Sequence, residues 1–208
     1  MSAGSLPRWI DFGLIPLLNL TAAFLVSGLV VLLIGENPLD AVQVLIWGSI
    51  GYGEGIGFTL FYATNFIFTG LAVAVAFHAG LFNIGGEGQA YLGGLGAALA
   101  CLALDQYAPW WITVPVAVLA AALYGAAWAA IPAWLQAKRG SHIVITTIMF
   151  NFIGTALMGY LLVKVINKSG SMQPETRTFA EGGQLPLLGD FFGTDFFGSS
   201  QVNLALFL

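Results

Sequence analysis

Long uncharged stretches, separated by single charges or short charged groups, dominate the first 163 residues of the chain. Five of these stretches hold 24, 32, 17, 32 and 24 residues without Asp, Glu, Lys or Arg. An α-helix rises about 1.5 Å per residue, so about 20 apolar residues cross the hydrocarbon layer of a membrane. Each stretch accommodates one span, the 17-residue stretch only narrowly. The pattern predicts an all-α, polytopic transmembrane helix bundle.

We place five spans in these stretches, together with one shorter apolar helix. The predicted spans cover residues 14–34, 58–79, 90–104, 111–135 and 143–163. Residues 42–50 are also apolar, but they are too few for a span and lie between Pro38 and a glycine-rich stretch at 51–55. We therefore expect an interfacial or re-entrant helix there.

The composition changes after the fifth predicted span. Residues 164–195 carry seven charges in 32 positions, with glycines and prolines throughout. We expect a transmembrane core at residues 1–163 and a long loop outside the lipid at residues 164–200. Residues 201–208 become apolar again and are expected to start a sixth span, so that the chain reads as truncated.

Basic residues indicate the orientation, because short cytoplasmic loops are enriched in Lys and Arg. Arg8 precedes the first span, and Lys138 and Arg139 follow the fourth, so all three lie on the same side by parity. We therefore expect a cytoplasmic N-terminus and an extracytoplasmic loop at residues 164–200. The three basic residues of that long loop are a partial conflict, although long loops follow the rule weakly.

Overall composition excludes several classes of protein. Only 8% of the residues are charged, against roughly 25% in an ordinary soluble domain. A net charge of −4 without a basic stripe argues against a nucleic-acid partner. His78 and His142 lie far apart without clustered metal ligands, and no phosphate-binding loop or nucleophile with a neighbouring base is present. We expect no catalytic residues, metal or cofactor.

Small residues mark the third and fourth predicted spans as packed inside a bundle. Ala121 and Gly125 in the fourth span, and Gly93 in the third, allow helix backbones to approach closely. Pro115 and Pro132 each remove a backbone hydrogen bond and permit a kink. A tightly packed helix with tolerated prolines and a hinged helix are both open.

Polar side chains within apolar stretches are the next signal, because they are costly in a membrane and mark pathways or helix contacts. Asn65 and Asn151 lie within predicted spans, where each either bonds a neighbouring helix or lines a solute path. Residues 77–89 bring Asn83, Glu87 and Gln89 among several glycines, which predicts a discontinuous or tightly turned element. A plain cytoplasmic turn remains the alternative to a re-entrant break.

Three motifs resemble those of a known family. They are His-Ala-Gly-Leu-Phe-Asn-Ile-Gly-Gly-Glu-Gly-Gln at 78–89, Lys-Arg-Gly-Ser-His with Ile-Thr-Thr-Ile-Met at 138–149, and Gln-Pro-Glu-Thr with Gln-Leu-Pro between 173 and 186. Their order and spacing resemble the permease subunits of bacterial ABC importers for nucleosides and simple sugars. That binding-protein-dependent family also includes ribose-type and branched-chain amino acid permeases. One departure is His78, where the family commonly has Arg or Lys.

The resemblance implies a non-enzymatic permease subunit in the bacterial inner membrane. Its implied partners are a second permease subunit, cytoplasmic ATP-binding subunits that hydrolyse ATP, an extracytoplasmic solute-binding lipoprotein, the transported solute and the lipid bilayer. A branched-chain amino acid permease is the alternative within this class. An integral membrane enzyme and a purely structural helix bundle are the alternatives outside it.

Two groups of candidate residues follow from these motifs. For the solute pathway, or the polar contacts that shape it, the candidates are Asn65, Asn83, Glu87, Gln89 and Asn151. For the surface that couples to the ATPase, they are Lys138, Arg139, Gly140, Ser141 and His142. The second group is short, basic and follows a helix that contains Pro132, which suits a docking element.

Overall fold

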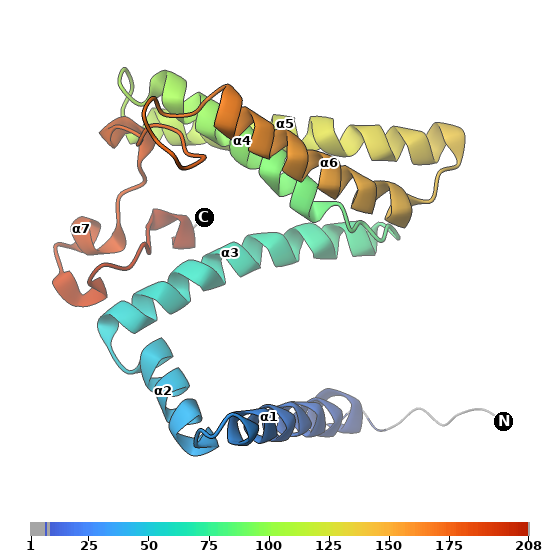
Figure 1. Ribbon diagram of the computed structural model, residues 1–208, viewed down its shortest axis with the longest axis vertical. Coiled ribbons are helices and arrows are strands. Elements are labelled where there is room, and N and C mark those ends of the chain that lie inside the picture. The colour runs from blue at the N-terminus through green and yellow to red at the C-terminus, as the bar shows by residue number, and fades with distance from the viewer. Residues whose placement is uncertain (1–6, 8, 208) are drawn as a thin grey trace. The chain divides into compact units, whose positions relative to one another are not determined.

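The computed structural model describes residue 7 and residues 9–207 (Figure 1). Helices form nearly all the regular structure of these residues, and a single isolated antiparallel bridge joins Leu187 to Asn203. The chain divides into two compact units, which we describe separately. The first runs to Thr59 and includes Phe196–Ser200, and the rest of the chain forms the second. Arg8, used above to predict the orientation, lies outside the described residues.

The first helix of the first unit is longer than the sequence pattern predicts. A π-helical stretch, η1 (Ile10–Leu14), continues directly into α1 (Ile15–Leu33), which gives 24 residues of apolar helix. At about 1.5 Å per residue this length exceeds the thickness of the hydrocarbon layer. The predicted first span is confirmed, with its start four residues earlier.

A tight corner connects α1 to α2 (Pro38–Ile50). Gly35 has a φ of +89°, a left-handed conformation that glycine adopts without strain. Asn37 then caps α2, because its side-chain oxygen accepts a hydrogen bond from the backbone N–H of Leu39 at 3.0 Å. Pro38 suits the first helical position, where its missing N–H costs nothing. The short predicted helix is confirmed, and its interfacial placement stays a prediction.

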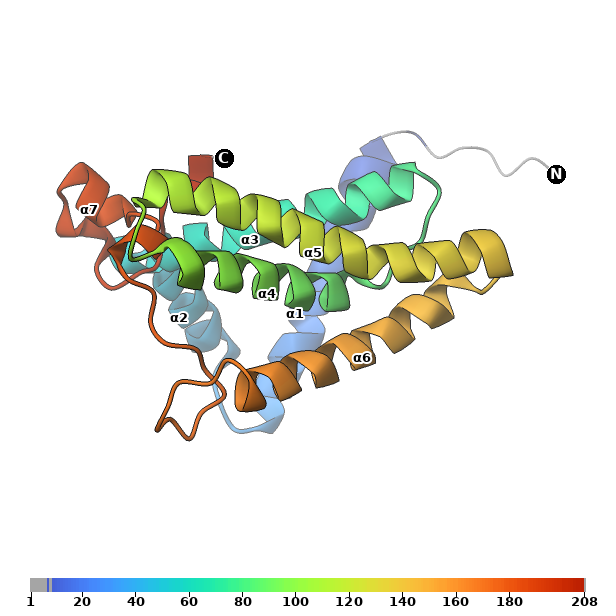
Figure 2. The ribbon, with the colours of Figure 1, turned by 90° about the horizontal axis from the view of Figure 1, so that it is seen from above.

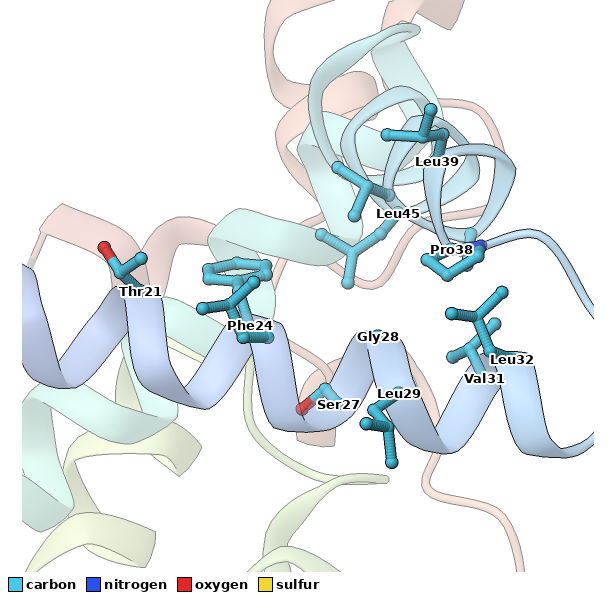
Figure 3. Close-up of a pocket in the computed structure, with 13 residues that line it drawn as sticks. Thr21, Phe24, Ser27, Gly28, Leu29, Val31, Leu32, Pro38, Leu39 and Leu45 are labelled. Atoms are coloured by element: carbon cyan, nitrogen blue, oxygen red, sulfur yellow. The ribbon is translucent and has the colours of Figure 1, made fainter.

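An apolar groove of about 580 Å³ lies between α1 and α2 (Figure 3). Phe24 and Leu32 line it from α1, and Leu45 lines it from α2. The two helices approach each other at Gly28, where an added Cβ would lie 3.6 Å from the Cβ of Pro38. A glycine on α1 therefore sets how closely the start of α2 can pack.

The glycine-rich stretch after α2 is mostly helical. α3 (Gly53–His78) begins five residues before the predicted span, so the last three residues of the glycine-rich stretch are helical. Packing explains the glycines: a side chain at Gly55 would overlap the carbonyl of Gly48 in α2, and one at Gly57 would overlap Ser200. The spacing of these glycines serves close backbone contact within the first unit.

The second unit is built around α4 (Gly86–Leu104), which packs along α5 (Trp110–Arg139) and also contacts α6 (Ile143–Lys164) (Figures 1 and 2). α4 starts four residues earlier than predicted, and α5 extends beyond its predicted span at both ends. α5 stays helical through both of its prolines, Pro115 and Pro132. The helix is therefore not interrupted at either proline.

Small residues hold α4 against α5, as predicted from the sequence. An added Cβ at Gly93 would lie 3.3 Å from the carbonyl oxygen of Ala121, and one at Gly96 would lie 2.7 Å from that of Ala120. Gly125 of α5 lies similarly close to the backbone of α4. Such close approach gives helices strong van der Waals contact in a membrane, where the lipid provides no hydrophobic drive for packing.

Four described helices are long and apolar enough to cross a membrane: Ile10–Leu33, Gly53–His78, Trp110–Arg139 and Ile143–Lys164. The third predicted span, α4, is long enough, but it is richer in glycine and carries Glu87 and Gln89 in its first turn. The chain is therefore a multi-pass membrane protein with an all-α fold.

The segment after α6 is largely irregular, and its place outside the lipid stays a prediction. Its short helices are η2 (Glu181–Gly183), α7 (Leu188–Phe192), η3 (Asp195–Phe197) and η4 (Leu204–Phe207). The start of a further span at residues 201–208 stays a prediction.

Candidate functional site

A break of seven residues separates α3 from α4. α3 ends at His78, Gly80 turns the chain with a φ of +72°, and α4 begins at Gly86. The predicted discontinuity is confirmed, but it ends earlier than expected because Gly86 and Gly88 lie inside the first turn of α4. Glycine costs least at a helix start, where the first backbone N–H groups have no partner within the helix.

Asn151 on α6 braces this break from across the helix interface. Its side-chain nitrogen donates a hydrogen bond to the carbonyl oxygen of Ile84 at 2.9 Å. Its side-chain oxygen accepts one from the backbone N–H of Gly88, also at 2.9 Å. The second bond satisfies one of the unpaired N–H groups at the start of α4. Of the two alternatives for Asn151, the structure shows the contact with a neighbouring helix.

Asn83 and Gln89 close the break from within. The side-chain oxygen of Asn83 accepts a hydrogen bond from the backbone N–H of Gly85 at 2.9 Å, which stabilises the turn. The side-chain amides of Asn83 and Gln89 face each other at 3.4 and 3.5 Å. Three amide side chains therefore hold the start of α4 in one place.

Gly88 brings α4 close to both α5 and α6 in the second unit. An added Cβ would lie 2.9 Å from the indole nitrogen of Trp128, 3.0 Å from the carbonyl of Phe150 and 3.1 Å from the side-chain oxygen of Asn151. On α6, an added Cβ at Gly154 would lie 3.2 Å from the Cα of Gly88. Trp128 is a neighbour of the site that the sequence analysis missed. Its buried indole N–H has no hydrogen-bond partner among the described residues.

A small cavity of about 270 Å³ lies beside this brace, between the start of α4 and α6. Its lining residues are Glu87, Ile148, Asn151, Phe152 and Thr155. The α6 residues recur every three to four positions, so they share one face of that helix. The cavity combines a carboxylate, an amide and a hydroxyl with an aromatic ring and an aliphatic side chain.

Asn65 does not join this group. It is exposed on α3, and its side-chain nitrogen donates to the carbonyl of Phe61 in the same helix at 3.2 Å. The structure therefore brings together four of the five predicted pathway residues, namely Asn83, Glu87, Gln89 and Asn151.

The predicted coupling segment is partly helical. Lys138 and Arg139 form the last turn of α5, and Gly140 ends the helix with a φ of +67°, a left-handed conformation typical of glycine at this position. The Arg139 guanidinium lies 5.9 Å from the centre of the Trp134 ring. Ser141 and His142 then lead into α6. Four of the five residues of the segment are exposed, and Ser141 is half-buried.

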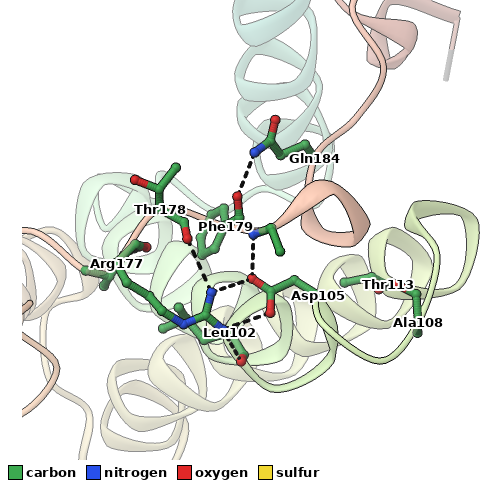
Figure 4. Close-up of polar contacts among 10 residues, drawn as sticks. Leu102, Asp105, Ala108, Thr113, Arg177, Thr178, Phe179 and Gln184 are labelled. Carbon is green, nitrogen blue, oxygen red and sulfur yellow. Dashed lines mark hydrogen bonds and ion pairs between the residues drawn. The ribbon is translucent and has the colours of Figure 1, made fainter.

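An ion pair between a buried carboxylate and a half-exposed guanidinium, which the sequence analysis missed, fixes the long loop to the other end of this unit (Figure 4). The two terminal nitrogens of Arg177 donate to the two carboxylate oxygens of Asp105 at 2.7 and 2.8 Å. Arg177 also donates to the carbonyl of Leu102 at 2.8 Å, and the backbone N–H of Ala180 donates to Asp105 at 2.8 Å. The Asp105 side chain is fully buried, whereas 36% of the Arg177 side chain is exposed.

Hydrogen bonds from Arg177 lower the pKa of Asp105 to about 2, and they outweigh burial, which raises it. The carboxylate is thus charged and fully paired at neutral pH. Arg177 therefore does not act as a free positive charge in the loop, which removes part of the conflict with the predicted orientation. Nearby, a side chain at Gly182 would overlap the backbone of Asp105 and Ala108. In the sequence, the pair Gly182 and Gly183 a few residues after Arg177 is the signal that could have suggested a close contact of the loop with the helices.

Three curated proteins resemble the chain. A glucose ABC transporter permease protein of Haloferax volcanii is 35% identical over 184 residues, which are 88% of this chain and 48% of that protein. A guanosine ABC transporter permease protein of Bacillus subtilis is 36% identical over 153 residues, 74% of this chain and 43% of that protein. A nucleoside ABC transporter permease protein of Lactococcus lactis is 32% identical over 163 residues, 78% of this chain and 44% of that protein.

The chain spans about half the length of the curated relatives it matches. No solved structure gives a significant match. The family described as "Branched-chain amino acid transport system / permease component" matches residues 55–208, a range that contains the braced break, the predicted coupling segment and the ion pair of Asp105 with Arg177. On this evidence the chain belongs to that family of permease components.

Proposed function

We propose that the chain is the permease subunit, or part of the permease subunit, of an ATP-driven ABC importer for a nucleoside or a simple sugar. The observation that carries this proposal is the similarity to three ABC transporter permease proteins over 74–88% of the chain. Their names specify glucose, guanosine and nucleosides. A branched-chain amino acid is the second candidate solute, because the description of the family specifies it.

The proposed partners are a second permease subunit, cytoplasmic ATP-binding subunits and an extracytoplasmic solute-binding lipoprotein. In this arrangement the partner subunits hydrolyse ATP, and the present chain moves the solute. Residues 138–142 form the proposed coupling surface, because they place two exposed basic side chains next to a short connection between two helices. An exposed, charged helix end suits a contact with a soluble partner.

The proposed location is the bacterial inner membrane, with a cytoplasmic N-terminus. Two contacts support the side assigned to the long segment after α6. Arg177 in this segment pairs with Asp105 at the α4–α5 connection. Ser199 in the same segment bonds to Glu54 at the start of α3. By parity both of those connections are extracytoplasmic, which agrees with the side proposed for the segment.

The proposed solute pathway includes the four clustered residues Asn83, Glu87, Gln89 and Asn151, with Asn65 on α3 as a further candidate. Support comes from their convergence on an interruption between two helices. Irregular backbone is tolerated within a membrane protein only where protein or water covers it, and such interruptions often carry binding sites.

Deletion of the gene in its native cells tests the proposal. We expect loss of uptake of radiolabelled guanosine or glucose, restored by a plasmid copy, with unchanged uptake of leucine. Loss of leucine uptake alone would assign the amino acid instead. Unchanged uptake of all three, in cells that express the protein, would contradict an importer for these solutes.

A further inference from the structure

The cavity between α4 and α6 combines groups that the brace alone does not require. The carboxylate of Glu87 is exposed at the edge of the cavity. Among the described residues, none forms a hydrogen bond or ion pair with this carboxylate. An unpaired carboxylate beside a cavity therefore has acceptor capacity for a ligand.

Asn151 has a different part in this cavity. Both ends of its amide are already used in backbone hydrogen bonds to Ile84 and Gly88, each at 2.9 Å. Gly88 directly follows Glu87 in the first turn of α4. The amide thus fixes the backbone that carries the carboxylate, and its remaining capacity for a ligand is one N–H and one lone pair.

We propose that Glu87 accepts hydrogen bonds from neighbouring hydroxyl groups of a sugar ring in this cavity, and that Asn151 acts as a positioning residue for it. This inference rests on the proposed function and specifies which part of the solute the site recognises. Monosaccharides and the ribose of nucleosides share the required pair of hydroxyls.

The shape and lining of the cavity support a sugar ring. A carboxylate has two oxygens that can each accept a hydroxyl hydrogen, and Phe152 and Ile148 offer an apolar surface for the face of the ring. A volume of about 270 Å³ lies just below the usual range for small-molecule sites, which fits a single ring.

The lining disfavours an amino acid. A zwitterion carries a carboxylate that needs a positive partner when desolvated. Of the five described residues that line the cavity none is basic, and the one charge, on Glu87, is negative.

A thiol-labelling experiment tests both roles without relying on transport. The full-length protein, assembled with its partner subunits in membrane vesicles, carries Ile148→Cys as a reporter on the cavity wall, and its other cysteines are replaced. The labelling rate with a water-soluble thiol reagent is measured with and without millimolar guanosine or glucose. We expect one of these solutes to slow labelling severalfold. Its analogue without the neighbouring hydroxyls, and leucine, should leave the rate unchanged.

Two substitutions separate the two roles. Glu87→Gln keeps the shape of an exposed side chain but removes the charge, and we expect it to abolish most of the protection by solute. Asn151→Leu removes both brace bonds and should also abolish protection, although Glu87 remains. If Asn151→Leu fails to reach the membrane, Asn151→Gln keeps the amide but moves it by one methylene, and we expect weaker protection. Asn19→Leu makes the same chemical change on α1 and serves as the control.

The outcomes distinguish this inference from the proposed function. Absence of uptake of every solute by the wild-type transporter would refute the function. Normal uptake without protection of the Ile148→Cys thiol, or protection that survives Glu87→Gln, would overturn the role of Glu87. Full protection in both Asn151 variants would overturn the positioning role.

Discussion

At the scale of single residues, glycine and asparagine determine the geometry of the candidate site. Gly88 allows α4, α5 and α6 to meet, because Trp128, Phe150 and Asn151 all lie within about 3 Å of the position where its Cβ would be. Asn151 uses that proximity to reach the backbone of the break. The absence of one side chain therefore makes the hydrogen bonds of another possible.

Gly88→Ala should destabilise the protein, although alanine favours helices more than glycine does by about 1 kcal/mol. Overpacking in a tight core typically costs about 1–3 kcal/mol, and here the new methyl group meets backbone and a braced amide. The measurement is the thermal unfolding midpoint of the full-length protein in detergent. Gly94→Ala on the same helix is the matched control, because an added Cβ there meets nothing within 4 Å. Equal midpoints for the two variants would contradict the close packing at Gly88.

At the scale of elements, the connections between helices are fixed by polar contacts. The break between α3 and α4 is held by amides, and the α4–α5 connection is held by the ion pair of the buried Asp105 with Arg177. The presence of such a pair says little about the free energy of unfolding, but removing Arg177 would leave the charge of the buried Asp105 uncompensated. The long loop is therefore tied to the helices at one defined place.

Attachment of the loop should weaken in acid. The pKa of Asp105 is about 2 in the folded protein and 3.8 ordinarily, so its contribution is present above about pH 4 and decreases as the pH falls towards 2. Hydrogen exchange in peptides covering residues 177–184, corrected for the intrinsic rate, should become faster over this range. Asp105→Asn should show fast exchange already at neutral pH, whereas Asp190→Asn, at an exposed position, should match the wild type. No change in exchange between neutral and acidic pH would contradict the assignment.

The coupling segment yields a prediction at the same scale. Lys138→Glu with Arg139→Glu reverses two exposed charges at the end of α5, so the ATP-binding subunits should no longer co-purify with the full-length permease. Loss of electrostatic complementarity at an interface weakens association. Lys164→Glu with Lys168→Glu makes the same change at the far end of α6 and beyond it, and should leave co-purification intact. Normal co-purification of the first variant would refute the coupling role.

At the scale of the whole molecule, the described residues form two compact units joined within α3 and through the C-terminal segment. Each unit contains helices with large exposed apolar side chains, as expected where lipid or other helices cover them. The side of the membrane on which each connection lies can therefore be tested without knowing how the two units pack.

Labelling two exposed positions from the two sides of the membrane tests this topology. In a full-length protein without other cysteines, His142→Cys should react with an impermeant thiol reagent only from the cytoplasmic side. Glu181→Cys should react only from the outside, because α6 crosses the membrane between the two positions. Labelling of both positions from the same side would contradict a spanning α6.

The sequence by itself determined the helices, their approximate positions, the family and most of the candidate residues. Long uncharged stretches, small residues at helical spacing and a glycine-rich break are patterns among residues that are near each other in the sequence. They can therefore be recognised without knowledge of the tertiary structure. They placed the ends of most helices within four or five residues. They missed the first turns of α3 and α4, where Gly53, Gly55 and Gly88 are helical and lie in close contact with other segments.

Only the tertiary structure decided which residues meet. Asn151 and Gly88 are 63 residues apart, and Arg177 and Asp105 are 72 apart. A single sequence has no signal for such pairs, because they depend on how three helices cross. The same reason separates Asn65, which bonds its own helix, from Asn151, which braces another, although both are asparagines in apolar stretches.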